Sequence, residues 1–308
     1  MSEPRCLACH GPLAERPALT GRDRMHGIPG SWPVHACLRC GSGTTLPQVT
    51  EAQLAGFYPQ DYAPFEVPTG PLATAMRIMQ RARDRRFPLV TLAGSGHVGG
   101  LGRTLLDVGC GRGDLAASWI DAGWRVVGIE PSPAAAAVAR RRGAEVREGT
   151  LSTVELEPES VDAAVFRHSL EHVVDPQRDL RRALAALRPG GRLALIVPNW
   201  DSWQRRAFGE YWFPLELPRH RTHFSEQGLR IALSAAGFQE IEIRPTTPLI
   251  TTAWSLQFRL FDRLLTSAGG ALLAGYAISI PLGLLTRGLD VALRSGDVLH
   301  AAAVRPGR

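Results

Sequence analysis

Between residues 104 and 245, short hydrophobic runs rich in β-branched residues alternate with alanine-rich runs whose apolar positions recur at helical spacing. Runs of the first kind are typical of buried strands, and those of the second kind end at Gly or Pro, as helices do. We therefore expect strands at Thr104–Val108, Arg125–Ile129, Glu145–Arg147, Val161–Phe166 and Arg192–Val197. Helices are expected between them, at Asp114–Ala122, Pro133–Arg142 and Gln177–Leu187.

This alternation predicts right-handed crossovers and a mostly parallel sheet. Ser225 and Gly237 suit the two caps of a further helix, and another strand is expected at Glu240–Arg244. A last strand is expected within Asp297–Pro306, which contains the apolar run Val298–Val304. The predicted fold class is therefore α/β, with a Rossmann-like sheet.

Residues 264–286 carry no charged side chain and, at about 1.5 Å per residue, are long enough as a helix to cross a bilayer. A single crossing would leave the last strand on the far side of the membrane, away from its sheet. We therefore expect a hydrophobic helical insert before the last strand, which either packs on the protein or lies in a membrane interface. Its flanking arginines would then lie near lipid phosphates: Arg259, Arg263, Arg287 and Arg294.

Composition divides the chain into consecutive parts. They are expected to be a zinc-binding module at 1–48, a connector with helices at 49–100, a catalytic core at 101–245, a helical insert at 246–296, and the last strand with the C-terminus at 297–308.

The formal net charge of +6 comes from arginine, since the sequence contains no lysine. The arginines are scattered and no basic stretch is interleaved with aromatic residues, so we expect no nucleic-acid partner, while an acidic small molecule or membrane surface fits the charge. The segment MSEPRC at the N-terminus has no apolar run like that of a secretion signal, which predicts a cytoplasmic protein with reduced cysteines.

Four of the five cysteines form two C-x-x-C pairs, Cys6 with Cys9 and Cys37 with Cys40. Each pair can present two thiolates to one tetrahedral ion, and together they make a closed structural site, so we expect Zn²⁺ bound by all four. His10 also completes the haem-attachment pattern C-x-x-C-H, but the second pair and the missing secretion signal argue against haem.

A glycine cluster at 109, 111 and 113 follows the first predicted strand directly and precedes a helix. Glycines there allow a sharp turn and close approach to a ligand, while Asp107 and Glu130, at the ends of neighbouring strands, can bind a nucleoside. A dinucleotide dehydrogenase would instead need G-x-G-x-x-G to bind a pyrophosphate, which Asp114 would repel.

These residues, in DVGCGRGD, VVGIEPSP and VDAAVFRHSLEHVVDP, make the chain resemble class I S-adenosylmethionine-dependent methyltransferases. The resemblance implies a seven-stranded sheet, Asp107 near the methionine amino group, Gly109 and Gly111 along the methionine, and Glu130 on the ribose. Cys110 is interpreted as a small residue of this turn and not as a nucleophile. The predicted cofactor-binding set is Asp107, Gly109, Cys110, Gly111, Asp114, Glu130 and Pro131.

His168, Glu171 and His172 follow the fourth predicted strand with the spacing H-x-x-E-H. A zinc-protease motif of this spacing belongs on a long helix, and its position directly after a strand argues against that function. Two interpretations stay open: His168 or His172 is the general base toward the methyl acceptor, or His172 only packs the short helix.

A segment rich in aromatic residues, arginine and histidine follows the fifth strand, where loops normally hold acceptors. It resembles that of bacterial methyltransferases associated with polysaccharide and glycolipid biosynthesis, which often carry a C-x-x-C module followed by a YPxDY-like run, here residues 57–62. The predicted acceptor residues are Trp212, Arg219, His220 and His223.

The resulting hypothesis is methyl transfer from S-adenosylmethionine to a sugar hydroxyl of a glycan or lipid-linked saccharide. Three alternatives are C-methylation of a nucleotide-sugar, O-methylation of another small molecule, and a non-catalytic scaffold, against which the intact cofactor residues count. Peripheral membrane contact through 264–286 and oligomer formation are left open.

Overall fold

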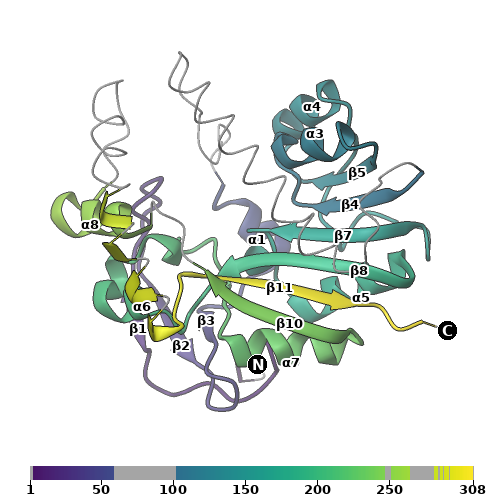
Figure 1. Ribbon diagram of the computed structural model, residues 1–308. Helices are drawn as coiled ribbons and strands as arrows, with labels where there is room; N and C mark the ends of the chain where they lie inside the picture. Colours follow the sequence, from purple (N-terminus) through teal and green to yellow (C-terminus); the bar gives the residue numbers. More distant parts are fainter. Residues whose placement is uncertain are drawn as a thin grey trace.

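The computed structural model describes residues 3–58, 102–246, 251–263, 281–283, 285–286, 288–290 and 292–307. Within them, one sheet has seven strands in the order β10-β11-β8-β7-β4-β5-β6 (Figure 1). Its strands are β4 (Thr104–Val108), β5 (Arg125–Glu130), β6 (Glu145–Glu148), β7 (Val161–Arg167), β8 (Leu187–Pro198), β10 (Gln239–Thr246) and β11 (Val298–Val304).

Strands β8, β7, β4, β5 and β6 run parallel, and β11 is antiparallel to both of its neighbours, β8 and β10. This confirms the predicted α/β fold class and the expected last strand. Although β11 comes last in the sequence, it lies inside the sheet, and β10 forms the edge.

Among the described residues, helices cover both faces of the sheet (Figure 1). They are α3 (Asp114–Ile120) and α4 (Pro133–Arg141) on one face, with α5 (Pro176–Ala186) and α7 (Glu226–Ala236) on the other. Neighbouring residues of β4 show the alternation that such a sheet requires: Leu105 joins the core beneath α3 and α4, whereas Leu106 joins the core beneath α5 and α7.

The expected caps of α7 are confirmed, since the Ser225 hydroxyl accepts from the Gly228 N–H at 2.9 Å and Gly237 has a φ of 101°. The predicted start of β8 at Arg192 is wrong. The strand begins at Leu187, because the chain pairs with β7 across the Pro-Gly-Gly sequence through an irregular register.

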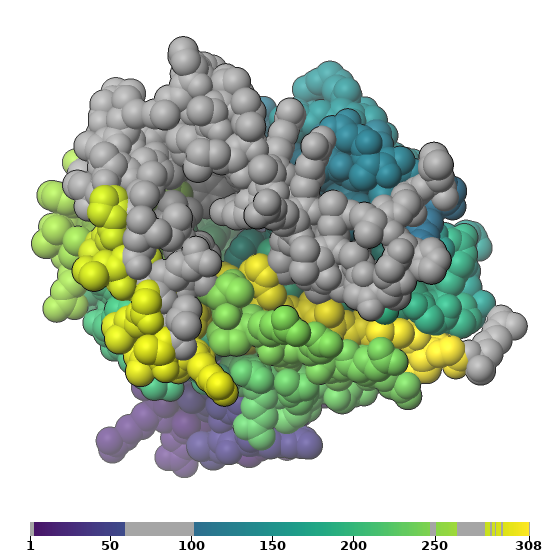
Figure 2. Space-filling model, viewed as in Figure 1, coloured from purple at the N-terminus to yellow at the C-terminus, as the bar shows by residue number. Residues whose placement is uncertain are grey.

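The N-terminal segment forms β1 (Leu19–Gly21), β2 (Trp32–Ala36), β3 (Gly43–Thr45) and α1 (Glu51–Ala55). Its sheet has the order β1-β2-β3-β9, in which β9 (Thr222–His223) comes from the catalytic part of the chain. Figure 2 shows this purple segment packed against the green part of the chain that contains α7. The cysteine-rich segment is thus joined to the loop that precedes α7.

Further helices lie after β7, in the loop after β8 and beyond β10. They are η1 (Leu170–His172), α6 (Trp203–Phe208), η2 (Gly209–Tyr211), η3 (Phe213–Leu215) and α8 (Thr251–Phe261). Most of the uncharged run 264–286 and most of the predicted connector lie outside the described residues. Among the helices that are described, none is both long and apolar enough to cross a membrane.

Candidate functional site

The turn between β4 and α3 lies at the carboxyl edge of the sheet. Gly109 and Cys110 both donate their backbone N–H groups to the Ile129 carbonyl of β5, at 2.9 and 3.1 Å, which fixes the turn against the neighbouring strand. Gly109, Gly111 and Gly113 have φ angles of 74°, 54° and 76°, a region that side chains rarely adopt.

Two of these glycines serve different purposes. A Cβ at Gly113 would lie 2.9 Å from the Cα of Ala139, so this glycine allows α3 to pack closely against α4. A Cβ at Gly111 would meet nothing within 4 Å. The backbone at Gly111 therefore faces open space, as a ligand-binding turn requires.

Asp107 and Glu130 are both buried beside this turn. Asp107 Oδ2 has no hydrogen-bond partner among the described residues, and burial raises the Asp107 pKa to about 6. Glu130 accepts the N–H groups of Gly111 and Ser132, each at 2.9 Å, one on each carboxylate oxygen. A carboxylate held in this way keeps lone pairs for two ribose hydroxyls, and Asp107 keeps an oxygen for an amino group, so both fit the expected cofactor.

Two of the other predicted cofactor residues, Cys110 and Asp114, contact other parts of the protein. The Cys110 thiol is buried and fills the space that a Cβ at Gly128 would need, and burial raises the Cys110 pKa, so the thiol is neutral. Asp114 forms an ion pair with Arg142 at the start of α3, and Pro131 is exposed. Contact of these residues with the cofactor stays a prediction.

The histidine segment after β7 lies directly against the cofactor turn. The Ser169 hydroxyl donates to the Val108 carbonyl at 2.6 Å, and a Cβ at Gly109 would lie only 2.7 Å from the Ser169 Cβ. His168 has a positive φ of 53°, and its side chain is 47% exposed. His168 Nδ1 lies 3.3 Å from Glu171 Oε1, so a buried carboxylate orients an accessible imidazole.

His172 and His220 meet edge to face, with ring centroids 4.4 Å apart and an interplanar angle of 85°. His172 Nδ1 is 2.9 Å from the Tyr58 hydroxyl, and His220 Nδ1 is 2.9 Å from the Pro214 carbonyl. Burial lowers the pKa of each histidine to about 4. Both rings are therefore neutral near pH 7.

Arg219 is fully buried and is committed to partners inside the protein. Its two terminal nitrogens donate to the two oxygens of Asp23, at 2.8 and 3.0 Å, and its Nε donates to Glu216 at 2.9 Å. Burial would raise the pKa of Glu216, but the neighbouring His220, His172 and Arg219 lower it to about 2. Glu216 is thus ionised in this group.

All four predicted acceptor residues are buried: Trp212, Arg219, His220 and His223 are each at most 4% exposed. Trp212 donates its Nε1–H to Asp297 at 3.1 Å, and His223 Nε2 lies 2.9 Å from the Thr45 hydroxyl. These contacts favour a role in holding the loop before α7. Direct contact with an acceptor stays a prediction.

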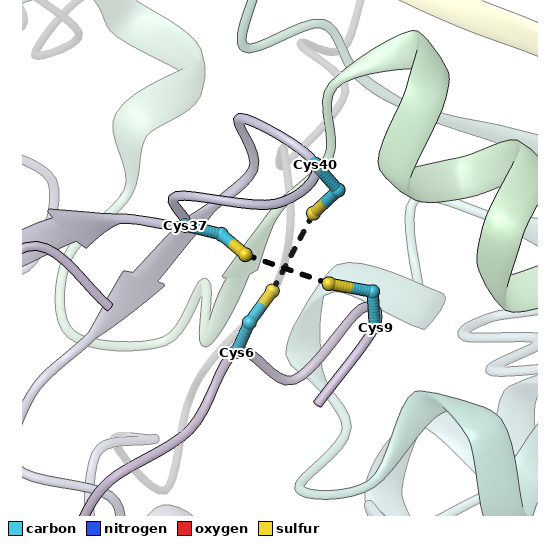
Figure 3. Close-up of side chains that lie close together, drawn as sticks. All are labelled: Cys6, Cys9, Cys37 and Cys40. Atoms are coloured by element: carbon cyan, nitrogen blue, oxygen red, sulfur yellow. Dashed lines mark hydrogen bonds between the residues drawn. The ribbon is translucent and has the colours of Figure 1, made fainter. Parts of the chain in front are cut away.

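The four N-terminal cysteines converge on one point (Figure 3). Their sulfur atoms all lie within 4.8 Å of one another, with Cys6 and Cys40 separated by 3.7 Å and Cys9 and Cys37 by 3.4 Å. Four thiolates at about 2.3 Å from a tetrahedral zinc lie roughly 3.8 Å apart, so donor type and spacing both fit this ion. The site belongs to the same apolar core as α5 and α7.

The cysteine-rich segment also holds the loop of the predicted acceptor residues by hydrogen bonds. The Thr45 hydroxyl donates to the His220 carbonyl at 2.7 Å, and Arg221 binds the carbonyls of Thr45 and Pro47. Gln177 of α5 donates to the Ala8 carbonyl at 2.9 Å. Placement of His220 therefore depends on residues far away in the sequence.

Sequence reasoning did not assign a site role to Asp23, Tyr58, Glu171 or Glu216. For Glu171 the H-x-x-E-H spacing is a usable signal, because it places a carboxylate one turn from a histidine. Asp23 and Glu216 have no local signal, since their importance arises only from the pairing with Arg219.

A comparison with protein-family models matches residues 76–243 to a methyltransferase domain. A ubiquinone biosynthesis O-methyltransferase of Methylobacterium sp. (strain 4-46) is 33% identical over 133 residues, which are 39% of this chain and 53% of that protein. An uncharacterized 37.1 kDa protein in transposon TN4556 of Streptomyces fradiae is 42% identical over 109 residues, 33% of this chain and 32% of that protein. The matches thus span about half or less of these relatives.

Among solved structures, a geranyl diphosphate methyltransferase in complex with GPP and sinefungin superposes with a TM-score of 0.51. It is 19% identical, with 76% of this chain and 81% of that chain covered. A Haemonchus contortus phosphoethanolamine N-methyltransferase 2 gives a TM-score of 0.50 at 22% identity, over 71% of this chain and 52% of that one. At this identity the likeness shows the fold.

Proposed function

The chain belongs to the class I S-adenosylmethionine-dependent methyltransferases, and on this basis we propose that it methylates a sugar hydroxyl of a glycan or lipid-linked saccharide. The cofactor supplies an electrophilic methyl group on a sulfonium. The observation that carries the proposal is the contact between the cofactor turn and the His168 segment through Ser169. It supports the proposal, because His168 directly precedes the residue that contacts the cofactor turn.

His168 is the residue of this segment that best suits a general base. Its Nδ1 faces Glu171, which leaves Nε2 for the acceptor, and its side chain is exposed enough to meet one. Asp107 and Glu130 would hold the cofactor, which would supply the methyl carbon to the acceptor oxygen while the electrons of the carbon–sulfur bond return to sulfur. The hydroxyl proton moves to His168, whose positive charge Glu171 stabilises.

His172 is the weaker candidate for this role. Its ring packs against His220 and its Nδ1 is bound to Tyr58, and the pKa lowered to about 4 makes it a poor proton acceptor. We propose that His172 belongs to the buried group that supports the acceptor side.

An oxygen acceptor is supported by the O-methyltransferases among the relatives. A sugar as its carrier is supported by the resemblance of the segment after β8 to methyltransferases of polysaccharide and glycolipid biosynthesis. Zinc in the four-thiol site is proposed as a structural ion, because all four ligand positions come from the protein.

The test compares variants in an assay with a natural acceptor. Glycans and lipid extracts from a strain that lacks the gene, incubated with the protein and methyl-labelled cofactor, should gain the label, and mass spectrometry should locate one added CH₂. His168→Ala should lower turnover by about a hundredfold or more and leave cofactor affinity nearly unchanged.

His26→Ala, which changes an exposed histidine of the N-terminal segment, is the matched control and should keep normal turnover. Near-normal turnover in His168→Ala would contradict the assignment of the base. Label found only in other compounds would contradict the sugar acceptor while leaving methyl transfer intact.

A further inference from the structure

A second group of metal-ligating side chains lies beside His168, apart from the four thiols. Glu171 and His172 come from η1, and His220 comes from the loop between η3 and β9. Each offers a ligand atom, and the three atoms lie within 4.8 Å of one another. Glu171 Oε1 and His220 Nε2 are 4.0 Å apart, so the carboxylate and this ring face the same small volume.

Glu171 provides an independent sign that something binds there. Its side chain is 0% exposed, and Oε2 has no hydrogen-bond partner among the residues that the structure describes. A carboxylate oxygen that is removed from water and left without a partner is unfavourable, and a bound cation would compensate for it. His168 contacts only the other oxygen, Oε1.

The outer hydrogen bonds of the two histidines also suit ligands of an ion. The Pro214 carbonyl can only accept, so His220 Nδ1 carries the proton and Nε2 presents a lone pair. His172 is held at Nδ1 by the Tyr58 hydroxyl. Metal-binding histidines are typically fixed in this way through the nitrogen that does not bind the ion.

We propose that Glu171, His172 and His220 bind one divalent first-row transition ion. Two imidazoles and one carboxylate suit such ions, and three protein ligands leave coordination positions open. In tetrahedral geometry an ion about 2.1 Å from each atom needs the ligand atoms about 3.4 Å apart, so atoms that now lie within 4.8 Å of one another must approach by at most about 1.4 Å. Glu216 Oε2, 3.5 Å from His220 Nε2, adds favourable negative charge.

The role of the ion rests on the proposed function, although its binding does not. Next to His168 and the cofactor turn, its open positions would hold acceptor oxygens close to the base. This would bring the acceptor into place without direct contact from the buried Arg219.

Mn²⁺ is a suitable probe, because it favours oxygen and imidazole ligands over the thiolates of the other site. Zinc-replete protein, titrated with Mn²⁺ and followed by the electron paramagnetic resonance of the free ion, should bind one Mn²⁺ per chain. Glu171→Gln and His220→Asn should each weaken binding by about tenfold or more. Glu226→Gln, which changes an exposed carboxylate on α7, is the matched control and should bind normally.

A second measurement needs no variant. Mn²⁺ bound here should enhance the relaxation of the protons of bound S-adenosylhomocysteine, and Co²⁺ bound here should show no thiolate charge-transfer band. Absence of Mn²⁺ binding by the wild type, unchanged affinity in Glu171→Gln, or bound Mn²⁺ without effect on the cofactor protons would each overturn the proposal. No methyl acceptor is added in these measurements, so their results do not depend on whether the proposed sugar acceptor is correct.

Discussion

The cofactor side and the acceptor side of the site are built in different ways. The predicted cofactor side comes from one stretch of chain, β4 to β5, and its carboxylates keep bonding capacity for a ligand: Asp107 Oδ2 has no hydrogen-bond partner within the described part of the chain. On the predicted acceptor side, segments that are far apart in the sequence lie together, as the pair of Asp23 with Arg219 shows. Arg219 is neutralised there by carboxylates of the protein itself. The first side is shaped for its ligand by a local motif, whereas the second depends on long-range support.

The largest test of this difference removes the proposed zinc. In Cys37→Ser the ion should be lost, and with it a binding free energy of about 10 kcal/mol or more that stabilises the cysteine-rich segment. Since β3 pairs with β9, the loop that carries His220 should lose its support. We expect turnover to fall by about a hundredfold or more, while S-adenosylmethionine affinity changes only a few-fold.

Metal analysis, limited proteolysis and calorimetry with the cofactor measure these effects. If cofactor affinity fell as far as turnover, the two sides would not be separable. Full zinc content in Cys37→Ser would show that four thiols are not required.

The next effect concerns the buried ion pair. Arg219→Ala should reduce the free energy of unfolding by about 3–5 kcal/mol, because it leaves Asp23 buried without its partner. Arg230→Ala, which breaks an exposed pair with Glu226 on α7, should cost about 0.5 kcal/mol or less. Urea unfolding compares the two.

Replacing both buried partners, as in Asp23→Leu with Arg219→Met, should recover part of the lost stability. Equal costs for Arg219→Ala and Arg230→Ala would contradict the structural role of Arg219.

On the cofactor side the expected effect is smaller. Glu130→Ala should weaken S-adenosylmethionine binding by about 1.5–3 kcal/mol through lost charge-assisted hydrogen bonds to the ribose. Glu145→Ala, which changes an exposed carboxylate at the start of β6, is the control and should bind normally. Calorimetry measures both, and unchanged affinity in a folded Glu130→Ala protein would remove this residue from the site.

The smallest effect is the pH dependence of stability on the acceptor side. Burial lowers the pKa of His172 and His220 to about 4, so between pH 4 and the unfolded value near 6.5 the unfolded chain binds more protons. Their contribution is complete above pH 6.5 and is lost as the pH falls toward 4. Asp107, whose pKa is raised to about 6, acts in the opposite direction.

Urea midpoints between pH 4 and 7 therefore need a comparison within the same protein. His220→Gln should show a shallower loss of stability on acidification than the wild type, because one buried histidine no longer needs to be protonated. Identical slopes would mean that His220 does not contribute to acid sensitivity.

The same division explains what the sequence could predict. Strand and helix order, the caps of α7 and the glycine turn follow from neighbouring residues, so Asp107, Gly111 and Glu130 could be placed from their spacing alone. The start of β8 could not be predicted in this way, because pairing with β7 overrides the Pro-Gly-Gly sequence, which locally indicates a break between elements.

Arg219 shows why the acceptor side was harder. An arginine in a loop is usually exposed, which favours a role in binding an acceptor. Its actual surroundings include Asp23, which lies 196 residues earlier in the sequence, and no pattern near either residue indicates that they meet. The role of Glu171 was partly predictable. Its spacing from His168 is visible in the sequence, but its burial depends on the distant loop around His220.

The place of β11 in the sheet limits the order in which the chain can fold. Strand β10 ends at Thr246 and hydrogen-bonds to the sheet through β11, which begins only at Val298. Strand β10 cannot hydrogen-bond to the sheet until β11 has paired with β8, which requires the two ends of the intervening chain to come together. Such loop closure is slow because it joins distant parts of the chain. Until then β8 is an open edge whose unpaired N–H and C=O groups can capture a strand of another molecule. When β11 inserts beside β8, it completes the sheet and covers this open edge. Before that step the folding intermediate is most prone to aggregate.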